Sequence, residues 1–147
     1  MQGNNLSNTV APRLVVIFEG GMAYMPSENV DKFLEFKRKN KWWKVIECYQ
    51  YFPAVIAQIE RLCRNTNVNF EVCTWMGDDA AEAIANDLDE MSLPIRAVWS
   101  LTPDELGRSL VWLPDIAYIY DPDPDHLLKY GKKGVLFKDA NQLGRGY

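Results

Sequence analysis

Histidine and cysteine are scarce in this sequence, and their scarcity limits the chemistry available to it. His126 is the only histidine among 147 residues, so a histidine-rich zinc centre or a Ser-His-Asp triad would have to be built around that one side chain. The three cysteines, Cys48, Cys63 and Cys73, contain no Cys-x-x-Cys pair. This odd, dispersed set indicates a reduced, intracellular chain with small buried thiols rather than a zinc knuckle or a disulfide scaffold.

Long apolar runs and an excess of positive charge are absent as well. The longest unbroken apolar stretch, residues 14–18, is far too short to cross a membrane, and the first twelve residues lack the charged start and apolar centre of a signal peptide. Sixteen basic residues against twenty acidic ones give a net charge of −4, which argues against nonspecific binding to nucleic acid or to an anionic membrane. We therefore expect a cytoplasmic protein for which membranes and nucleic acids are poor candidate partners.

Short apolar runs alternate with amphipathic stretches along the rest of the chain. Residues 14–18 form a continuous apolar run that ends in Glu19-Gly20-Gly21, a pattern typical of a strand buried on both faces. Apolar residues at helical spacing follow over residues 52–64. Further strands are expected at residues 70–74, 95–99, 116–120 and 134–137, with helices that begin near Gly77, Thr102 and Asp139. The alternation predicts a single α/β domain over residues 1–147, a Rossmann-like three-layer sandwich with a mainly parallel central sheet.

Residues 22–51 do not fit this alternation. A connection of such length between the first strand and the first helix is expected to have structure of its own, as a short cap or flap inserted after the first strand. One interpretation of its sequence is a solvated helix end followed by the aromatic pair Trp42-Trp43 anchored in the core. The other is a positively charged lid that faces an anionic ligand. Within the segment, residues 37–44 carry five of the sixteen basic residues of the chain: Lys37, Arg38, Lys39, Lys41 and Lys44.

The residues that follow the expected strands are the candidates for a functional site, because open parallel sheets bind ligands beyond the carboxyl ends of their strands. Glu19 follows the first strand, Thr74 ends the second, and Asp121, Asp123 and Asp125 follow the fourth. Carboxylate oxygens suit Mg²⁺, and a hydroxyl with free backbone N–H groups can hold a phosphate oxygen. The sequence therefore points to a magnesium-dependent phosphate site at this edge of the sheet.

In the order of these elements, residues 14–143 resemble the haloacid dehalogenase-like (HAD-like) superfamily, a group of Rossmann-like phosphohydrolases. The resemblance rests on residues 14–21, on residues 70–74 with the helix that follows, and on residues 116–125 with two downstream segments. Those segments are Gly131-Lys-Lys-Gly-Val-Leu-Phe137 and Asp139-Ala-Asn-Gln-Leu143. The resemblance implies a phosphatase-like hydrolase fold that uses Mg²⁺ and takes a phosphorylated substrate.

The first motif of the family is where this sequence departs most. Active members have Asp-x-Asp after the first strand, a nucleophile followed by a general acid and base, whereas this chain has Glu19-Gly20-Gly21. Glutamate is one methylene longer, and a displacement of about 1 Å can cost about 100-fold in rate. Gly21 supplies no proton, and a general acid contributes roughly 100-fold to 10,000-fold. Ordinary phosphatase turnover is therefore not expected.

The next two family motifs are partly kept. Thr74 matches the second motif, a hydroxyl that binds the transferring phosphoryl group, although a β-branched residue also suits the end of a strand. The third motif is a basic residue that neutralises the phosphate, and it has no clear match here. Arg108 is nearest in order, with Arg96 and Lys129 as alternatives. The resemblance thus implies Glu19, Thr74 and Arg108 as the catalytic positions.

The fourth motif is a pair of acids that hold Mg²⁺, and Asp121 and Asp125 have the required spacing. The resemblance implies a metal site formed by these two residues and Glu19, although Asp-Pro repeats are also ordinary turn and helix-start signals. His126 follows the acidic turn directly, and we expect it to be a solvated polar residue rather than a catalyst. The five tryptophans are expected in the core or at an interface, except for Trp75, which could line a pocket beside Thr74.

Three functions are compatible with these features. The first is a catalytically impaired HAD-like domain, a pseudo-phosphatase that binds a phosphorylated ligand or a protein partner in a regulatory role. The second is an active Mg²⁺-dependent phosphohydrolase or phosphotransferase that uses Glu19 or the acids around Asp121. The third is an unrelated α/β protein-interaction module. The missing Asp-x-Asp pair favours the first.

Overall fold

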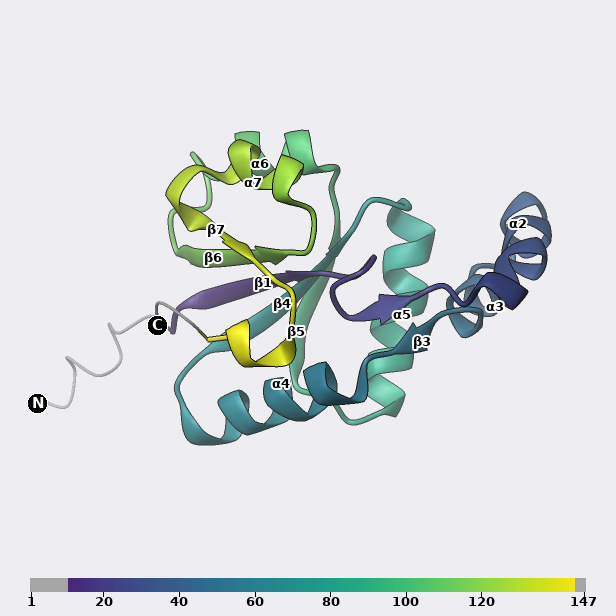
Figure 1. Cartoon of the computed structure of the whole chain (residues 1–147), viewed down its shortest axis with the longest axis horizontal. Coiled ribbons are helices and arrows are strands. Elements are labelled where there is room, and N and C mark those ends of the chain that lie inside the picture. Colours follow the sequence, from purple (N-terminus) through teal and green to yellow (C-terminus); the bar gives the residue numbers. More distant parts are fainter. Residues whose placement is uncertain (1–10, 145–147) are drawn as a thin grey trace, which may run out of the picture.

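The computed structural model describes residues 11–144 and shows an α/β domain built around a five-stranded parallel sheet (Figure 1). The strands lie in the order β5-β4-β1-β6-β7, which is the 3-2-1-4-5 order of doubly wound sheets when the strands are numbered along the chain. The Rossmann-like α/β class expected from the sequence is thus confirmed. The strand bounds are β1 (Arg13–Ile17), β4 (Asn69–Thr74), β5 (Ile95–Ser100), β6 (Ile116–Asp121) and β7 (Gly134–Leu136).

Helices cover both faces of this sheet and complete the three-layer sandwich. On one face lie α4 (Pro53–Asn65) and α5 (Asp78–Glu90), and on the other lie α6 (Pro103–Ser109) and α7 (Pro124–Tyr130) (Figure 1). The side changes where the chain crosses from β5 back over β4 and β1 to β6. β1 therefore marks the switch point of the sheet, beyond whose carboxyl end such folds bind their ligands.

β1 supplies the centre of the hydrophobic core on both faces. Leu14, Val16 and Phe18 pack toward the α4–α5 layer, whereas Val15 and Ile17 pack toward the α6–α7 layer, and each is at most 1% exposed. The alternation follows from the pleat of the strand, which points successive side chains to opposite faces. Burying an aliphatic side chain of this size contributes about 1.5–3 kcal/mol. This two-sided burial explains the continuous apolar run in the sequence.

Several helix starts are set by side chains that the sequence pattern had indicated. The Thr102 hydroxyl accepts a hydrogen bond from the Glu105 amide (3.2 Å), and the Glu105 carboxylate accepts one from the Thr102 amide (2.9 Å), which forms a capping box at the start of α6. Asp139 caps in the same way, but it begins a short 3₁₀ turn, η3 (Ala140–Gln142), rather than an α-helix. Gly77, at φ 108°, adopts the positive φ that turns the chain from β4 into α5.

A buried ion network that the sequence pattern did not indicate joins β1, β4 and β5 on the α6–α7 side. The Arg13 guanidinium donates two hydrogen bonds of 2.7 Å to the carboxylate of Glu71, and a third of 2.9 Å to Asp115. Glu71 also accepts the indole N–H of Trp99 (2.6 Å) and lies 3.5 Å from Arg96. Burial acts to raise the pKa of Glu71, but the hydrogen bonds from Arg13 and Trp99 outweigh it and lower that pKa below its usual value. The network holds Glu71 as a carboxylate inside the domain.

Residues 22–51 form an insertion with structure of its own, as expected. Two short strands, β2 (Ala23–Tyr24) and β3 (Gln50–Tyr51), pair antiparallel at its base. Between them lie η1 (Ser27–Asn29), α2 (Val30–Arg38) and α3 (Trp42–Glu47). α3 packs against α5, and α2 packs on α3, so the two helices stand at one side of the molecule beyond the sheet (Figure 1).

The expectation that Trp42 and Trp43 anchor together in the core is wrong for Trp43. Trp42 packs against the core, but the Trp43 side chain is 60% exposed. Successive residues of a helix point in directions about 100° apart, so adjacent tryptophans in α3 cannot share one buried face. Trp99 and Trp112 are also exposed, so of the two positions expected for them, core or interface, the core is excluded. Trp75, the expected exception, is exposed as well.

Two expectations about cysteines and membranes can be compared with the structure. Cys48 and Cys73 are buried and Cys63 is half-buried, and all three are free thiols. In residues 11–144 we find no helix that is both long and apolar enough to span a bilayer.

Candidate functional site

The candidate site begins at the turn after β1. Here the Met22 amide donates to the carbonyls of Ile17 (3.2 Å) and Phe18 (3.1 Å), so the chain coils back on the end of the strand. This coil brings Gly21 so close to β1 that a Cβ atom at residue 21 would lie 2.1 Å from the Ile17 carbonyl oxygen. Only glycine fits this path. The position that carries the second Asp in active HAD-like members therefore cannot hold an acid without a shift of the main chain.

Glu19 and Thr74, which sequence analysis expected at one site, are in direct contact. The buried Thr74 hydroxyl donates to Glu19 Oε2 at 2.6 Å, and the Trp75 amide donates to the same oxygen at 3.3 Å. The Met76 amide in turn donates to the Thr74 hydroxyl oxygen at 3.3 Å. The hydroxyl and the amide at the end of β4 are the types of donor that hold a phosphate oxygen in the expected site. In this structure the carboxylate of Glu19 accepts the hydrogen bonds of both donors.

The second oxygen of Glu19 is in a different situation. Oε1 is buried, and no hydrogen-bond partner reaches it among the residues that the structure describes. Burial raises the pKa of Glu19 above its usual value, the hydrogen bonds from Thr74 and Trp75 oppose this, and the negative charge of Asp121 adds to it. Oε1 is thus an acceptor without a hydrogen bond in the described residues. The raised pKa means that the Glu19 carboxyl is protonated more readily in the folded protein than in water.

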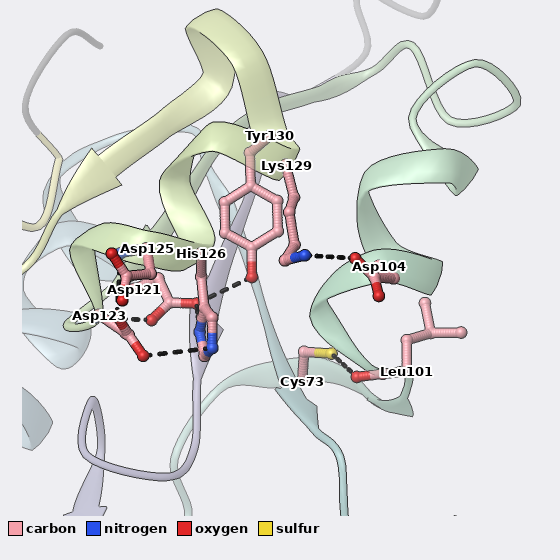
Figure 2. A network of polar contacts seen from close by, with 9 residues as sticks. All are labelled: Cys73, Leu101, Asp104, Asp121, Asp123, Asp125, His126, Lys129 and Tyr130. Atoms are coloured by element: carbon pink, nitrogen blue, oxygen red, sulfur yellow. Dashed lines mark hydrogen bonds and ion pairs between the residues drawn. The ribbon is translucent and has the colours of Figure 1, made fainter.

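Asp121 ends β6 and is completely buried, with both carboxylate oxygens engaged (Figure 2). Oδ1 accepts the Asp123 amide at 2.9 Å. Oδ2 accepts the Tyr130 hydroxyl at 2.8 Å and lies 3.0 Å from His126 Nδ1. Tyr130 was missed by sequence analysis, because nothing in its position distinguishes it from the other tyrosines of the chain. Burial and the hydrogen bond to Asp121 both raise the pKa of Tyr130, so it remains a hydroxyl donor.

His126 differs from the solvated residue that we expected. Its Nδ1 lies 3.0 Å from Asp121 Oδ2 and its Nε2 lies 3.3 Å from Asp123 Oδ2, so each ring nitrogen faces a carboxylate oxygen (Figure 2). The ring also meets Trp75 edge-on, with 5.6 Å between centroids. Because both facing atoms are acceptors, only the doubly protonated ring can donate to both. Trp75 is 40% exposed and follows the carboxyl end of β4 directly, where its ring contacts this histidine.

The three proposed metal ligands do not form an open set. Asp125 is exposed in the first turn of α7, where its amide donates to Asp123 Oδ1 at 2.9 Å and thereby helps to cap the helix. Both oxygens of Asp121 are used by protein donors, which leaves Glu19 Oε1 as the free acceptor. Across residues 11–144, no three histidine, cysteine, aspartate or glutamate side chains are grouped to hold a metal ion. The arrangement therefore does not fit Mg²⁺ without rearrangement, and a magnesium site remains a prediction.

Two of the three basic residues considered for the third motif form ion pairs with other acids, and the third is exposed. Arg96 lies against Glu71 in the buried ion network. Lys129 pairs with Asp104 at 2.5 Å on the outer side of α6 and α7 (Figure 2). Arg108 is exposed on α6, where its charge helps to lower the pKa of Asp104. In the described part of the chain, no ion pair joins any of these cations to Glu19.

Sequence comparison adds no family assignment to this geometry. The chain matches no known protein family, and a search of curated proteins finds no similar sequence.

What the site can do chemically follows from its contacts. It holds a carboxylate against a hydroxyl and an amide, and beside it a fully bonded aspartate with a histidine between two acids. A nucleophilic attack on a phosphoryl group would need an acid to protonate the leaving group and a cation to offset the charge of the phosphate. The acid is excluded at Gly21 by the backbone, and among the third-motif candidates Arg96 and Lys129 pair with other acids. Arg108 is exposed on α6.

Proposed function

We propose that this chain is a HAD-like, phosphatase-like domain that has become a pseudoenzyme and works by binding. The observation that carries the proposal is the contact of Glu19 Oε2 with the Thr74 hydroxyl (2.6 Å) and the Trp75 amide (3.3 Å). These two donors would have to receive a phosphoryl oxygen in an active site of this type. A side chain that already fills them has to leave before a phosphorylated substrate can enter.

The same contacts favour a protein partner over a phosphorylated small molecule. A phosphate at this edge would face Glu19, Asp121 and Asp123, whose charges repel an anion. Exposed aromatic side chains, by contrast, are available for protein contacts, among them Trp43, Trp75 and Trp112. The proposed role is therefore regulatory or structural binding of protein. Three free cysteines support the expected cytoplasmic location.

A hydrolysis assay tests the absence of phosphatase function. An aryl phosphate ester is incubated with the full chain and Mg²⁺, and product is measured for the wild type, for Glu19→Gln and for Glu60→Gln, an exposed control in α4. We expect all three to give the uncatalysed rate. Strong turnover by the wild type and the control that is abolished in Glu19→Gln would refute the proposal.

One observation favours a second candidate, an active Mg²⁺-dependent phosphohydrolase or phosphotransferase. Glu19 Oε1 is buried without a partner in the described residues, and a cation would satisfy it. This candidate predicts that Mg²⁺ stabilises the chain by about 2.7 kcal/mol at one hundred times its dissociation constant, and that Glu19→Gln and Asp125→Asn remove the effect. Thermal unfolding with and without Mg²⁺ decides between the two functions, because the pseudoenzyme should show no shift.

A further inference from the structure

Positive and negative charge are segregated on two neighbouring surfaces of the molecule. The first surface, which we call the basic tip, is the end of α2 and the start of α3. It carries five basic side chains and no acidic one over residues 37–44: Lys37, Arg38, Lys39, Lys41 and Lys44. The second surface, the acidic stripe, lies on α5, a helix with six acidic residues and no basic one. Its exposed members at helical spacing are Asp79, Glu82, Asp89 and Glu90.

Within residues 11–144, a single ion pair to an acid, Glu35, is formed by the cations of the basic tip. Lys39 pairs with Glu35 at 3.0 Å, one turn earlier in α2. Lys44 lies over the rings of Phe36 (5.2 Å) and Trp43 (5.1 Å) rather than against an acid. Arg38 and Lys41 are exposed, and neither takes part in an ion pair within residues 11–144. The tip therefore presents positive charge to any surface that approaches it.

Two large apolar side chains are exposed on the same two helices as these charges. Leu34 of α2 is 55% exposed and Trp43 of α3 is 60% exposed, and α2 contains no buried residue at all. Large apolar side chains that sit among charges in this way are typical of the centre of a protein interface, where tryptophan contributes strongly once it is covered. Both side chains are thus exposed on the helices that carry the basic tip, and no other element of residues 11–144 covers them.

The acidic stripe borders this surface directly. α3 packs on α5 (Figure 1). A groove between them is lined by Trp43 from α3 and by Asn86 and Glu90 from α5. The exposed acids Glu82, Asp89 and Glu90 form no ion pair in the described part of the chain. Opposite charges thus lie on either side of an exposed tryptophan.

We propose that this surface is the interface of a two-fold symmetric homodimer, in which the basic tip of each copy lies on the acidic stripe of the other. Two adjacent patches of opposite charge become self-complementary when a copy is rotated by a two-fold axis between them, because each patch then meets its opposite twice. Trp43 and Leu34 lie near that axis and are covered by the second copy. The inference is independent of whether the Glu19 site is catalytic.

The charge pattern favours a second copy over the other occupants that a basic surface could bind. A polyanion such as a nucleic acid would gain contacts at the basic tip but would be repelled by the acidic stripe next to it. An acidic protein segment would meet the same repulsion. Only a partner that carries both signs in the matching arrangement satisfies the whole surface, and this chain is such a partner.

Sedimentation and light scattering of the full chain test the proposal. We expect a dimer at about 50 mM sodium chloride, with a dissociation constant that rises at least about tenfold at about 500 mM, because salt screens exposed charges. The charge-reversed variant Arg38→Glu/Lys41→Glu should be monomeric at the lower salt concentration, and so should Glu82→Lys/Glu90→Lys. The variant Arg61→Glu/Arg64→Glu, which changes two exposed charges on α4 by the same amount as the first variant, should remain dimeric.

Mixing the two monomeric variants gives the decisive measurement. In a heterodimer of the two variants the glutamates at 38 and 41 meet the lysines at 82 and 90, and the unchanged tip meets the unchanged stripe. An equimolar mixture should therefore form a heterodimer although neither variant dimerises alone. Circular dichroism of each variant establishes that it is folded. A wild type that is monomeric at low salt, an association that is indifferent to salt, or a mixture that stays monomeric would each overturn the proposal. Recovery of the wild type as a complex with nucleic acid bound at the tip would do the same.

Discussion

Glu19 shows how one additional methylene changes the role of a carboxylate. An aspartate at this position would carry its carboxylate about 1.5 Å closer to the main chain, the length of one C–C bond. The longer side chain reaches across the end of β4 and meets the Thr74 hydroxyl at 2.6 Å. Glu19 thus connects the ends of β1 and β4. Its Oε1 is buried without a partner in the described residues and its pKa is raised, because burial disfavours the ionised carboxylate.

The pH dependence of stability should reveal this cost. Because the pKa of Glu19 is raised in the folded state, its ionisation destabilises the fold progressively as the pH rises above the usual value of 4.5. In Glu19→Gln this dependence is absent. The free energy of unfolding of the variant, minus that of the wild type, should therefore increase between about pH 4.5 and about pH 7.5. Urea titrations at both pH values measure the difference. A difference that stays constant with pH would contradict the raised pKa.

The Arg13–Glu71 pair should respond in the opposite direction to pH. The pKa of Glu71 is lowered, so its stabilising effect is complete above the usual value of 4.5 and is lost as the pH falls through the folded-state pKa. Arg13→Met leaves the carboxylate of Glu71 buried without its main partner, and we expect a loss of about 3–5 kcal/mol at neutral pH. The double variant Arg13→Met/Glu71→Gln should recover part of this loss. Chemical unfolding of the three proteins measures it, and a loss below about 1 kcal/mol in the single variant would mean that the pair is not needed.

At the scale of elements, α6 and α7 meet through a glycine. A Cβ atom on Gly107 would lie 2.3 Å from the Lys129 carbonyl oxygen, so the two helices approach each other more closely than any other side chain would allow. Glycine in a helix ordinarily costs about 1 kcal/mol relative to alanine, so a Gly→Ala change normally stabilises. Here the contact should reverse the sign.

We therefore expect Gly107→Ala to lower the free energy of unfolding by about 1–3 kcal/mol, the usual range for overpacking. Thermal and urea unfolding measure the change. Ala57→Gly, at an exposed position of α4, is a suitable control, because it should cost the ordinary helix penalty of about 1 kcal/mol. An increase in stability for Gly107→Ala would show that the two helices can separate without loss.

Elements with a burial pattern were predictable from the sequence, and those without one were not. Residues 14–18 predicted β1 because both sides of that strand are covered, and Thr102 with Glu105 predicted the start of α6 because a capping box is a local device. The insertion offered no such signal. Its strands β2 and β3 are two residues long and α2 buries nothing, so the sequence indicated structure over residues 22–51 without its form.

The site was predictable to a similar degree, and for a related reason. Glu19 and Thr74 follow neighbouring parallel strands, so the topology alone brings them to one edge. The partners of Asp121 depend instead on how α7 folds back over β6, which sets the distances to His126 and Tyr130. No short-range pattern specifies that return. From its place in the sequence, Asp121 was expected to be a metal ligand with free oxygens. Spacing along the chain cannot show that protein donors already bond to both of those oxygens.

For the whole molecule, the difference between a sheet buried on both sides and an insertion with an unburied helix predicts uneven stability. Amides of β1 and β4 should exchange hydrogen only on global unfolding, whereas those of α2 should exchange through local opening, at least about 100-fold faster. Hydrogen–deuterium exchange with mass spectrometry measures this, in about 500 mM salt to keep the chain monomeric. Equal protection of α2 and β1 would contradict the prediction, and protection of α2 only at low salt would support the proposed dimer.

Because Glu19 is bound to the end of β4, its carboxylate competes with any free anion for the Thr74 and Trp75 donors. A tethered carboxylate acts on the Thr74 and Trp75 donors at an effective concentration at least on the order of millimolar, and no change in the surroundings can dilute it. Free inorganic phosphate has to exceed that concentration, weighted by relative affinity, before it gains a place. Under the proposed function, ordinary changes in the concentration of small anions would therefore leave this edge of the sheet unoccupied by them. A ligand that enters would have to provide a new partner for the Glu19 carboxylate.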